Sequence, residues 1–251
     1  MTRHFWDTSA GFNNPSSIHQ EGLGAFKKVD EARKKIAEIL FAHPDEIIFT
    51  SSGTESDNLA ILGTAELSTK KHIITTAIEH KAVLEPCRHL QKKGYRVTYL
   101  GVDKNGSVNL KEFKESLTKD TFLVSVMMAN NEIGTIQPIK EIAKIIRHFK
   151  KENNIHLPYF HTDACQAPRF LDLNVAKLGV DLLTFNGSKI YGPQGIGALY
   201  VRRGTMIGPV ILGGGQERGL RPGTHNVAGI LGLAEALTLC AKNRDKEVKS
   251  L

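Results

Sequence analysis

The chain has 251 residues, a formal net charge of +7, and 41% hydrophobic and 24% charged residues. This length and composition are typical of an ordinary globular protein, and the chain is long enough to bury the core of one large domain or two small ones. No apolar run is long enough to span a bilayer, and the N-terminal residues lack the apolar core of a secretory signal, so we expect neither a membrane protein nor a secreted one.

The distribution of charge and the cysteine content indicate which partners and which cellular compartment to expect. The basic residues are scattered along the predicted helices rather than gathered in one arm, which favours a solvated surface over nucleic-acid binding. The three cysteines, Cys87, Cys165 and Cys240, have neither disulfide-framework nor metal-ligand spacing. We therefore expect a cytoplasmic protein with no metal, no membrane partner and no nucleic-acid partner.

Residues 1–20 carry turn chemistry without periodicity, so we expect an irregular arm there, followed by one domain over residues 21–251. In that domain, segments with apolar residues at helical spacing alternate with short apolar runs. Helices are predicted over 21–41, 57–67, 81–93, 110–117, 139–150 and 227–241, and strands over 46–50, 72–76, 96–101, 121–128, 159–164, 181–185 and 196–201. This alternation predicts a three-layer α/β fold, with a mostly parallel sheet and helices on both faces.

Small polar residues from Ser51 to Ser56 follow the first strand and precede a helix. Unpaired backbone N–H groups at a helix N-terminus attract a phosphate, and Ser and Thr hydroxyls add donors. The same residues could instead cap the helix with no ligand bound. From this stretch alone, both interpretations stay open.

Polar side chains also follow two further strands. His80 comes after the strand over 72–76, and Asn130 and Asn131 come after the strand over 121–128. A histidine there could lie against an aromatic cofactor and transfer protons, although a histidine at a helix start is more often a surface or capping residue. A glycine-rich loop with arginines, residues 213–226, is either a flexible surface loop or a backbone nest for an anion.

The central stretch, residues 159–201, places a carboxylate and an amine at two strand ends. Asp163 ends one apolar run, and Lys189 follows the next, just before a Gly/Pro-rich turn. There the amine can be partly desolvated, as a Schiff-base lysine requires, and the acid could hold the pyridine nitrogen of pyridoxal phosphate protonated. Ligands of open α/β sheets bind at the carboxyl ends of strands, although strand-end Asp and Lys are also common as plain surface charges.

Taken together, these stretches resemble a known family. Seven of them occur in order between about residue 13 and about residue 230: NPSSIH, FTSSGTESDNLAI, EHKAVLEP, NNEIGTIQPI, HTDACQA, GSKIYGPQGIGALYVR and GGGQERGLRPGTHN. The chain resembles the pyridoxal-phosphate-dependent cysteine desulfurases of the NifS/IscS type, within the class V aminotransferase group. The resemblance implies the fold type I large domain of these enzymes.

The resemblance also implies a role for each matching residue. Lys189 would bind the cofactor covalently and shuttle protons, and His80 would stack on its ring and serve in acid–base steps. Asp163 would pair with the pyridine nitrogen, Gln166 would bond the phenolic oxygen, and Asn131 would lie near that oxygen and the substrate carboxylate. The phosphate would be held by Gly53, Thr54, Asn186 and Ser188, and across a dimer interface by Thr224.

The implied activity is removal of sulfur from L-cysteine, leaving L-alanine, with the sulfur passed as a persulfide to iron–sulfur cluster assembly or tRNA thiolation. The implied partners are a second copy of the chain, in a homodimer, and a sulfur-acceptor or scaffold protein. A selenocysteine lyase or another class V aminotransferase or lyase would share these motifs nearly as well. A non-catalytic remnant that dimerises with an intact desulfurase is a further alternative.

The sequence departs from the family pattern at three places. Ser188 precedes the lysine where these enzymes usually have histidine, and residues 6–11 are at best a shortened form of their N-terminal Asp-Asn-Ala-Thr-Thr arm. The smaller C-terminal domain, with its persulfide cysteine and the arginine that clamps the substrate carboxylate, is not matched. We expect Cys165 to pack beside the cofactor ring rather than act as the nucleophile, and we expect a truncated form that does not complete sulfur transfer unaided.

Overall fold

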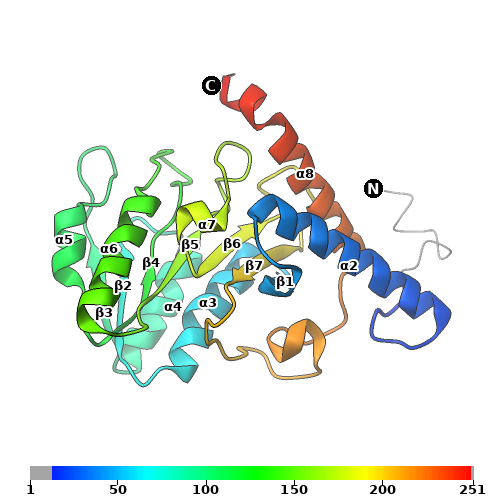
Figure 1. Cartoon of the computed structure of the whole chain (residues 1–251), viewed down its shortest axis with the longest axis horizontal. Helices are drawn as coiled ribbons and strands as arrows, with labels where there is room; N and C mark the ends of the chain where they lie inside the picture. Colours follow the sequence, from blue (N-terminus) through cyan, green and yellow to red (C-terminus); the bar gives the residue numbers. More distant parts are fainter. Residues whose placement is uncertain (1–12, 250–251) are drawn as a thin grey trace.

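The computed structural model describes residues 13–249, which form one sheet with helices around it (Figure 1). Its helices are α2 (Gln20–Leu40), α3 (Gly53–Leu67), α4 (Lys81–Lys92), α5 (Leu110–Ser116), α6 (Ile139–Asn153), α7 (Val175–Leu178) and α8 (Val227–Lys249), with 3-10 turns η2 (Pro44–Glu46) and η3 (Gln216–Gly219). Its strands are β1 (Ile47–Thr50), β2 (His72–Thr76), β3 (Arg96–Leu100), β4 (Thr121–Ser125), β5 (Tyr159–Asp163), β6 (Leu182–Asn186) and β7 (Gly197–Val201).

The strands lie in the order β1-β7-β6-β5-β4-β2-β3. Neighbours from β6 to β3 pair in parallel, whereas β7 is antiparallel to both β6 and β1. Because two reversals restore the direction, β1 runs the same way as β6. The carboxyl ends of β1, β2, β4, β5 and β6 therefore meet at one edge of the sheet. The predicted mostly parallel sheet is confirmed.

The alternation of side chains along each strand divides the core into two layers. Ile74 packs in one apolar cluster with α2, α5, α6, α7 and α8, and its neighbour Ile73 packs in another with α3 and α4. Helices thus cover both faces of the sheet, which confirms the three-layer prediction. No helix within residues 13–249 is long and apolar enough to cross a membrane.

α2 shows how the sequence produces its helices. Ala25, Val29, Ile36 and Leu40 recur at spacings of four and seven residues and are buried, so one stripe of the helix faces the core. His19 caps the helix by accepting a hydrogen bond from the Gly22 N–H. α2 packs against α8 beside the β1 end of the sheet (Figure 1).

Four predicted boundaries were wrong by three residues or more, among them the end of α6, which lies at Asn153 rather than at residue 150. α3 begins at Gly53 rather than residue 57, because Gly53, Thr54 and Ser56 in its first turn have low helix propensity and also suit a turn. β4 ends at Ser125, three residues early, although the N–H groups of Val126 and Met128 still bond to carbonyls of β5. α8 continues to Lys249 along a polar segment that lacks the apolar periodicity used to place its end.

The predicted N-terminal arm lies only partly within the described residues. Residues 13–19 contain no helix or strand, and the helix starts at Gln20. The stretch over residues 6–11 lies outside the described part of the chain.

Candidate functional site

A cleft opens at the edge where the five strand ends meet. Its volume is about 500 Å³, including the open mouth. It is lined by Gly53, Thr54, Asp57, His80, Ala82, Met127, Ala129, Asn131, Asp163, Cys165, Gln166, Asn186 and Lys189. Of the ten predicted site residues, only Ser188 and Thr224 do not line it, and both are exposed.

The start of α3 forms one wall of the cleft. Ser52 caps the helix, its hydroxyl accepting a hydrogen bond from the Glu55 N–H at 3.2 Å. The N–H groups of Gly53 and Thr54 belong to the first turn, which leaves them without an intrahelical acceptor. A Cβ on Gly53 would lie 2.6 Å from Cys165 Sγ, so only glycine lets the backbone come this close. The capping and anion-site interpretations therefore apply to different residues of one turn.

Asp163 lies at the last position of β5 and is 7% exposed. Its Oδ1 accepts a hydrogen bond from the Cys165 N–H at 2.9 Å. Burial raises the pKa of the Asp163 carboxyl, and this hydrogen bond only partly offsets that effect. A cationic group beside it, such as a protonated ring nitrogen, would favour the ionised form.

A buried polar row extends behind Asp163, between α3 and the sheet. His161 Nδ1 lies 2.8 Å from Ser125 Oγ, and its Nε2 lies 3.1 Å from Thr184 Oγ1 and 3.5 Å from Asp57 Oδ1. Burial lowers the pKa of His161 to about 3, so the contact with Asp57 is not an ion pair. Burial, followed by the nearby Asp163, raises the pKa of Asp57 well above its ordinary value.

Sequence reasoning missed Asp57. It is fully buried, and neither carboxyl oxygen has a hydrogen-bond partner among the described residues. A signal existed, because Ala60 and Ile61 follow Asp57 at spacings of three and four residues, which places the acid on the same side of α3 as apolar residues. An acid among buried helix positions indicates a site rather than a solvated face.

His80 caps a helix, which is the more common role of a histidine at a helix start, and it also lines the cleft. Its Nδ1 accepts a hydrogen bond from the Ala82 N–H at 3.1 Å, which caps α4. In the neutral ring, that contact leaves the proton on Nε2. Capping therefore fixes both the position and the tautomer of the ring at the mouth of the cleft.

Two neighbours that were not given a role in the predicted site hold the strand ends together. Asn130 donates to the Ile78 carbonyl at 3.0 Å and accepts from the N–H groups of two residues in its own turn. Glu79 accepts from Met127 N–H at 2.8 Å and from the Thr76 hydroxyl at 2.9 Å. Burial raises the pKa of Glu79 to about 8, with these hydrogen bonds opposing the shift. The turn that follows β4 is thereby tied to the end of β2, which precedes His80.

Lys189 lies just beyond β6 and lines the cleft, but the residue is exposed. The expected desolvation of its amine is therefore not provided by these residues alone. Ser188 is exposed beside it. Asn186 lies at the end of β6, and its buried Oδ1 has no partner among the described residues.

The cysteines of the described chain offer no ready nucleophile. Cys87 and Cys240 are buried in α4 and α8. Cys165 lies half-buried at the cleft, where burial and then the adjacent Asp163 raise its thiol pKa well above the ordinary value. A thiol held in its neutral form is a poor nucleophile, in agreement with the expectation of a packing role.

The sequence profile of the aminotransferase class-V family matches residues 2–250. This chain belongs to that family. A curated relative, "Cysteine desulfurase IscS" of Dictyoglomus turgidum, is 54% identical over 242 residues, which cover 96% of this chain and 60% of the relative. The chain thus spans about three fifths of the length of that relative.

Solved structures agree with this membership. One described as "NifS-like protein" is 42% identical, with a TM-score of 0.91 over 98% of this chain and 66% of the other. Another, described as "SspA in complex with cysteine", is also 42% identical, with a TM-score of 0.84 over 93% of this chain and 66% of the other. The fold is therefore that of the NifS-like, fold type I large domain.

The family depends on pyridoxal phosphate, and the cleft fits that group. Gly53 provides a close backbone approach at a helix N-terminus, which suits a phosphate. Asp163 offers a buried carboxylate that a ring N–H could neutralise, and the Asn186 side-chain NH2, 3.3 Å from where a Cβ on Gly53 would lie, offers a donor beside the helix start. Lys189 supplies an amine at the same cleft. These donors and acceptors match an anionic, aldehyde-bearing heterocycle.

Proposed function

We propose that residues 21–251 are the cofactor-binding large domain of a pyridoxal-phosphate-dependent cysteine desulfurase. The observation that carries the proposal is the single cleft lined by Lys189, Asp163 and His80. The names of the relatives support L-cysteine as the substrate, as does the neighbouring structure that holds cysteine.

In the proposed reaction, the sulfur of L-cysteine passes to a thiol, RSH. The C–S bond breaks, a C–H bond and an S–S bond form, and the products are L-alanine and RSSH. Atoms and electrons balance without an added oxidant. Pyridoxal phosphate, when bound, supplies the electron sink that makes the C–S bond labile.

The chain's own residues bind and orient the reactants. The N–H groups of Gly53 and Thr54, the Thr54 hydroxyl and Asn186, which all line the cleft, would hold the phosphate. Asp163 would accept a hydrogen bond from the ring N–H, and Gln166 would donate one to the phenolic oxygen. Because the carboxylate is buried, this charge-assisted hydrogen bond is stronger than it would be in water.

Two residues handle protons in this proposal. The Lys189 amine would hold the cofactor and, when free, would move a proton at the substrate carbon. The His80 ring, whose Nδ1 caps α4, would stack on the cofactor ring and would use Nε2 for proton transfer to the departing sulfur. Asn131, which lines the same cleft, would bond the substrate carboxylate.

The remaining expectations concern partners. Ser188, exposed next to Lys189, would add a donor to the phosphate, and Thr224 would reach the phosphate of a second copy, so the working form would be a homodimer. With Cys87 and Cys240 buried and burial holding Cys165 in its thiol form, the accepting thiol would lie outside the described residues, and its persulfide would pass to a sulfur-acceptor or scaffold protein in the cytoplasm.

The proposal is tested by reconstituting the protein with pyridoxal phosphate and adding L-cysteine with dithiothreitol as the acceptor thiol. We expect a visible absorption band distinct from that of the free cofactor, and formation of alanine that disappears in Lys189→Ala. Absence of both from the parent protein would overturn the proposal. Turnover of selenocysteine in preference to cysteine would instead assign the chain to the lyases.

A further inference from the structure

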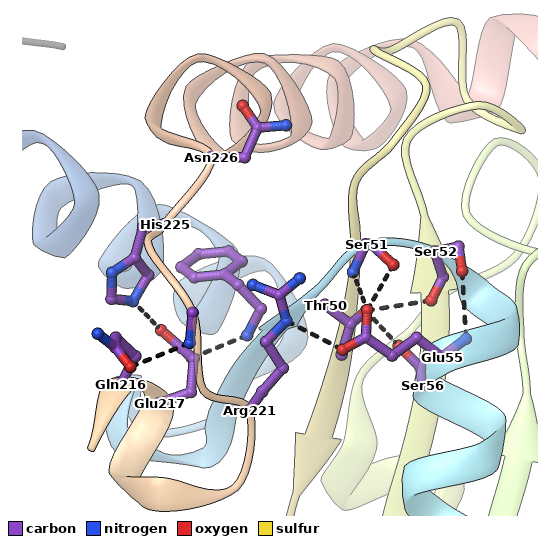
Figure 2. A network of polar contacts seen from close by, with 12 residues as sticks. Thr50, Ser51, Ser52, Glu55, Ser56, Gln216, Glu217, Arg221, His225 and Asn226 are labelled. Atoms are coloured by element: carbon purple, nitrogen blue, oxygen red, sulfur yellow. Dashed lines mark hydrogen bonds and ion pairs between the residues drawn. The ribbon is translucent and has the colours of Figure 1, made fainter. Parts of the chain in front are cut away.

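The glycine-rich loop, residues 213–226, is anchored to the body of the protein at two points (Figure 2). The first anchor is Glu217, whose buried carboxylate accepts hydrogen bonds from Arg33 of α2 at 2.5 and 2.9 Å, from the Phe49 N–H at 2.8 Å, and from His225 at 2.6 Å. This anchor ties the loop to α2 and β1.

The second anchor reaches the start of α3, next to the cleft. Arg221 Nε donates to Glu55 Oε1 at 2.9 Å. Glu55 Oε2 accepts from the Ser51 N–H at 2.6 Å and from the Ser51 hydroxyl at 2.5 Å. Figure 2 shows Arg221 extending from the loop toward this carboxylate. The two paired side chains are only 24% and 16% exposed, so solvent screens this pair less than a surface pair.

Glu55 occupies a position that conflicts with the proposed ligand. It lies in the first turn of α3, directly after Gly53 and Thr54, which line the cleft. An acidic side chain there stabilises the positive end of the helix dipole. A phosphate ester, which carries nearly two negative charges at pH 7, would be attracted to the same end. An uncompensated Glu55 carboxylate would therefore repel the phosphate at short range.

In the structure, the negative charge of Glu55 is offset by neighbouring donors. Burial alone would raise the pKa of Glu55, but hydrogen bonds from Ser51 and Arg221 outweigh it and hold that pKa below its ordinary value. Glu55 is thus ionised at neutral pH, and the Arg221 guanidinium is the cation paired with it. The same contact fixes the loop three residues before Thr224.

We propose that Arg221 is a positioning residue of the cofactor site, cancelling the Glu55 charge beside the phosphate and fixing the glycine-rich loop to the helix that receives it. This role rests on the proposed function, because that function places the phosphate at the start of α3. Arg221 itself does not line the cleft, so its effect passes through Glu55.

A four-protein comparison tests the proposal: the parent, Arg221→Gln, Glu55→Gln and the double variant, each titrated with pyridoxal phosphate at constant ionic strength. We expect Arg221→Gln to weaken cofactor binding by about tenfold or more, because it leaves a carboxylate unpaired next to a dianion. Glu55→Gln should bind as well as the parent or better. The double variant should recover to within about threefold of the parent, because the repelling charge is gone.

The matched control is Arg203→Gln. Arg203 also forms an ion pair, with Asp45, and its loss changes the net charge equally, but it is exposed and does not line the cleft. It should bind the cofactor as the parent does. The proposal would be overturned if the double variant bound the cofactor no more tightly than Arg221→Gln, or if Arg221→Gln bound it as tightly as Arg203→Gln. The double variant is decisive because removing a second charge cannot repair a loss of packing.

Inorganic phosphate separates this proposal from the proposed function. It should raise the melting temperature of the parent more than that of Arg221→Gln. If the parent forms no cofactor absorption but phosphate gives this pattern, the role of Arg221 holds and the proposed function fails. If the parent responds to neither probe, both are wrong.

Discussion

Asp163 and Lys189 line the same cleft from the ends of two adjacent parallel strands, although 26 positions separate them in the chain. Asp163 is paired in register with Thr184 of β6, and Lys189 follows that strand by three residues. Acid and amine therefore face one cleft from positions set by strand spacing, which is the arrangement a single bound heterocycle needs.

Asp163→Asn separates cofactor binding from stability. Loss of the carboxylate would remove the proposed buried, charge-assisted hydrogen bond to the ring, so we expect affinity for pyridoxal phosphate to fall about 10- to 100-fold. The cofactor-free protein should be as stable as the parent or more so, because burial disfavours this carboxylate when no cation faces it. Cofactor titration and urea denaturation of the same samples measure both quantities.

The control for that change is Asp172→Asn, at an acid that is half exposed and paired with Lys177. It should leave cofactor affinity unchanged. Equal affinities for Asp163→Asn and the parent would show that the ring nitrogen lies elsewhere.

Asp57→Asn should change how stability depends on pH. Burial raises the pKa of Asp57 in the folded protein above the value of about 4 in the unfolded chain. The stability contribution of the neutral carboxyl is therefore fully present below about pH 4, and it is lost as the pH rises from there through the folded-state pKa. Asparagine stays neutral. Above pH 4, the free energy of unfolding of the variant should therefore rise relative to that of the parent, by up to about 1.4 kcal/mol per pH unit. Urea denaturation of cofactor-free protein between about pH 4 and 8 measures this, and parallel curves would contradict it.

Glu217→Gln should destabilise the protein strongly. It leaves the Arg33 guanidinium without its buried carboxylate, which costs about 3–5 kcal/mol. Burial opposes ionisation of Glu217, but bonds from His225 and Arg33 lower its pKa to about 2, so its contribution is present above about pH 4.5 and lost as pH falls toward 2.

Thermal and urea denaturation across this pH range measure the Glu217 effect. Asp45→Asn, which breaks an exposed ion pair, should cost less than about 1 kcal/mol. A Glu217→Gln variant as stable as Asp45→Asn at neutral pH would mean that this network contributes little.

His80→Asn tests whether the two roles of His80 can be separated. Asparagine is itself a good N-cap, so stability should change by less than about 0.5 kcal/mol. Formation of alanine from L-cysteine should fall about 100-fold or more, because the proton-transfer group is lost. Unchanged turnover would leave His80 with the capping role alone.

The sequence predicted the order and type of the main elements because strand and helix periodicities are local. It also predicted eight of the residues that line the cleft, since motifs at strand ends share one edge of a parallel sheet. It placed the start of α3 four residues late because the first turn of that helix consists of cap residues, whose local chemistry also suits a turn.

Contacts between segments distant in the chain could not be predicted. Asp57 meets His161 only once α3 lies on the sheet, and Glu55 meets Arg221 across 166 positions. Ser188 and Thr224 are exposed outside the cleft, although the family motifs place them at the phosphate. Such contacts follow from tertiary packing and assembly, on which local patterns carry no information.

The central claim is that Lys189 is the amine that holds pyridoxal phosphate. It is tested most directly by reducing the reconstituted protein with borohydride, which fixes the cofactor to its lysine, and mapping the modified peptide by mass spectrometry. We predict one pyridoxyl group, on Lys189, and none in a sample that was not reconstituted. Modification of another lysine instead, or none at saturating cofactor, would contradict the claim.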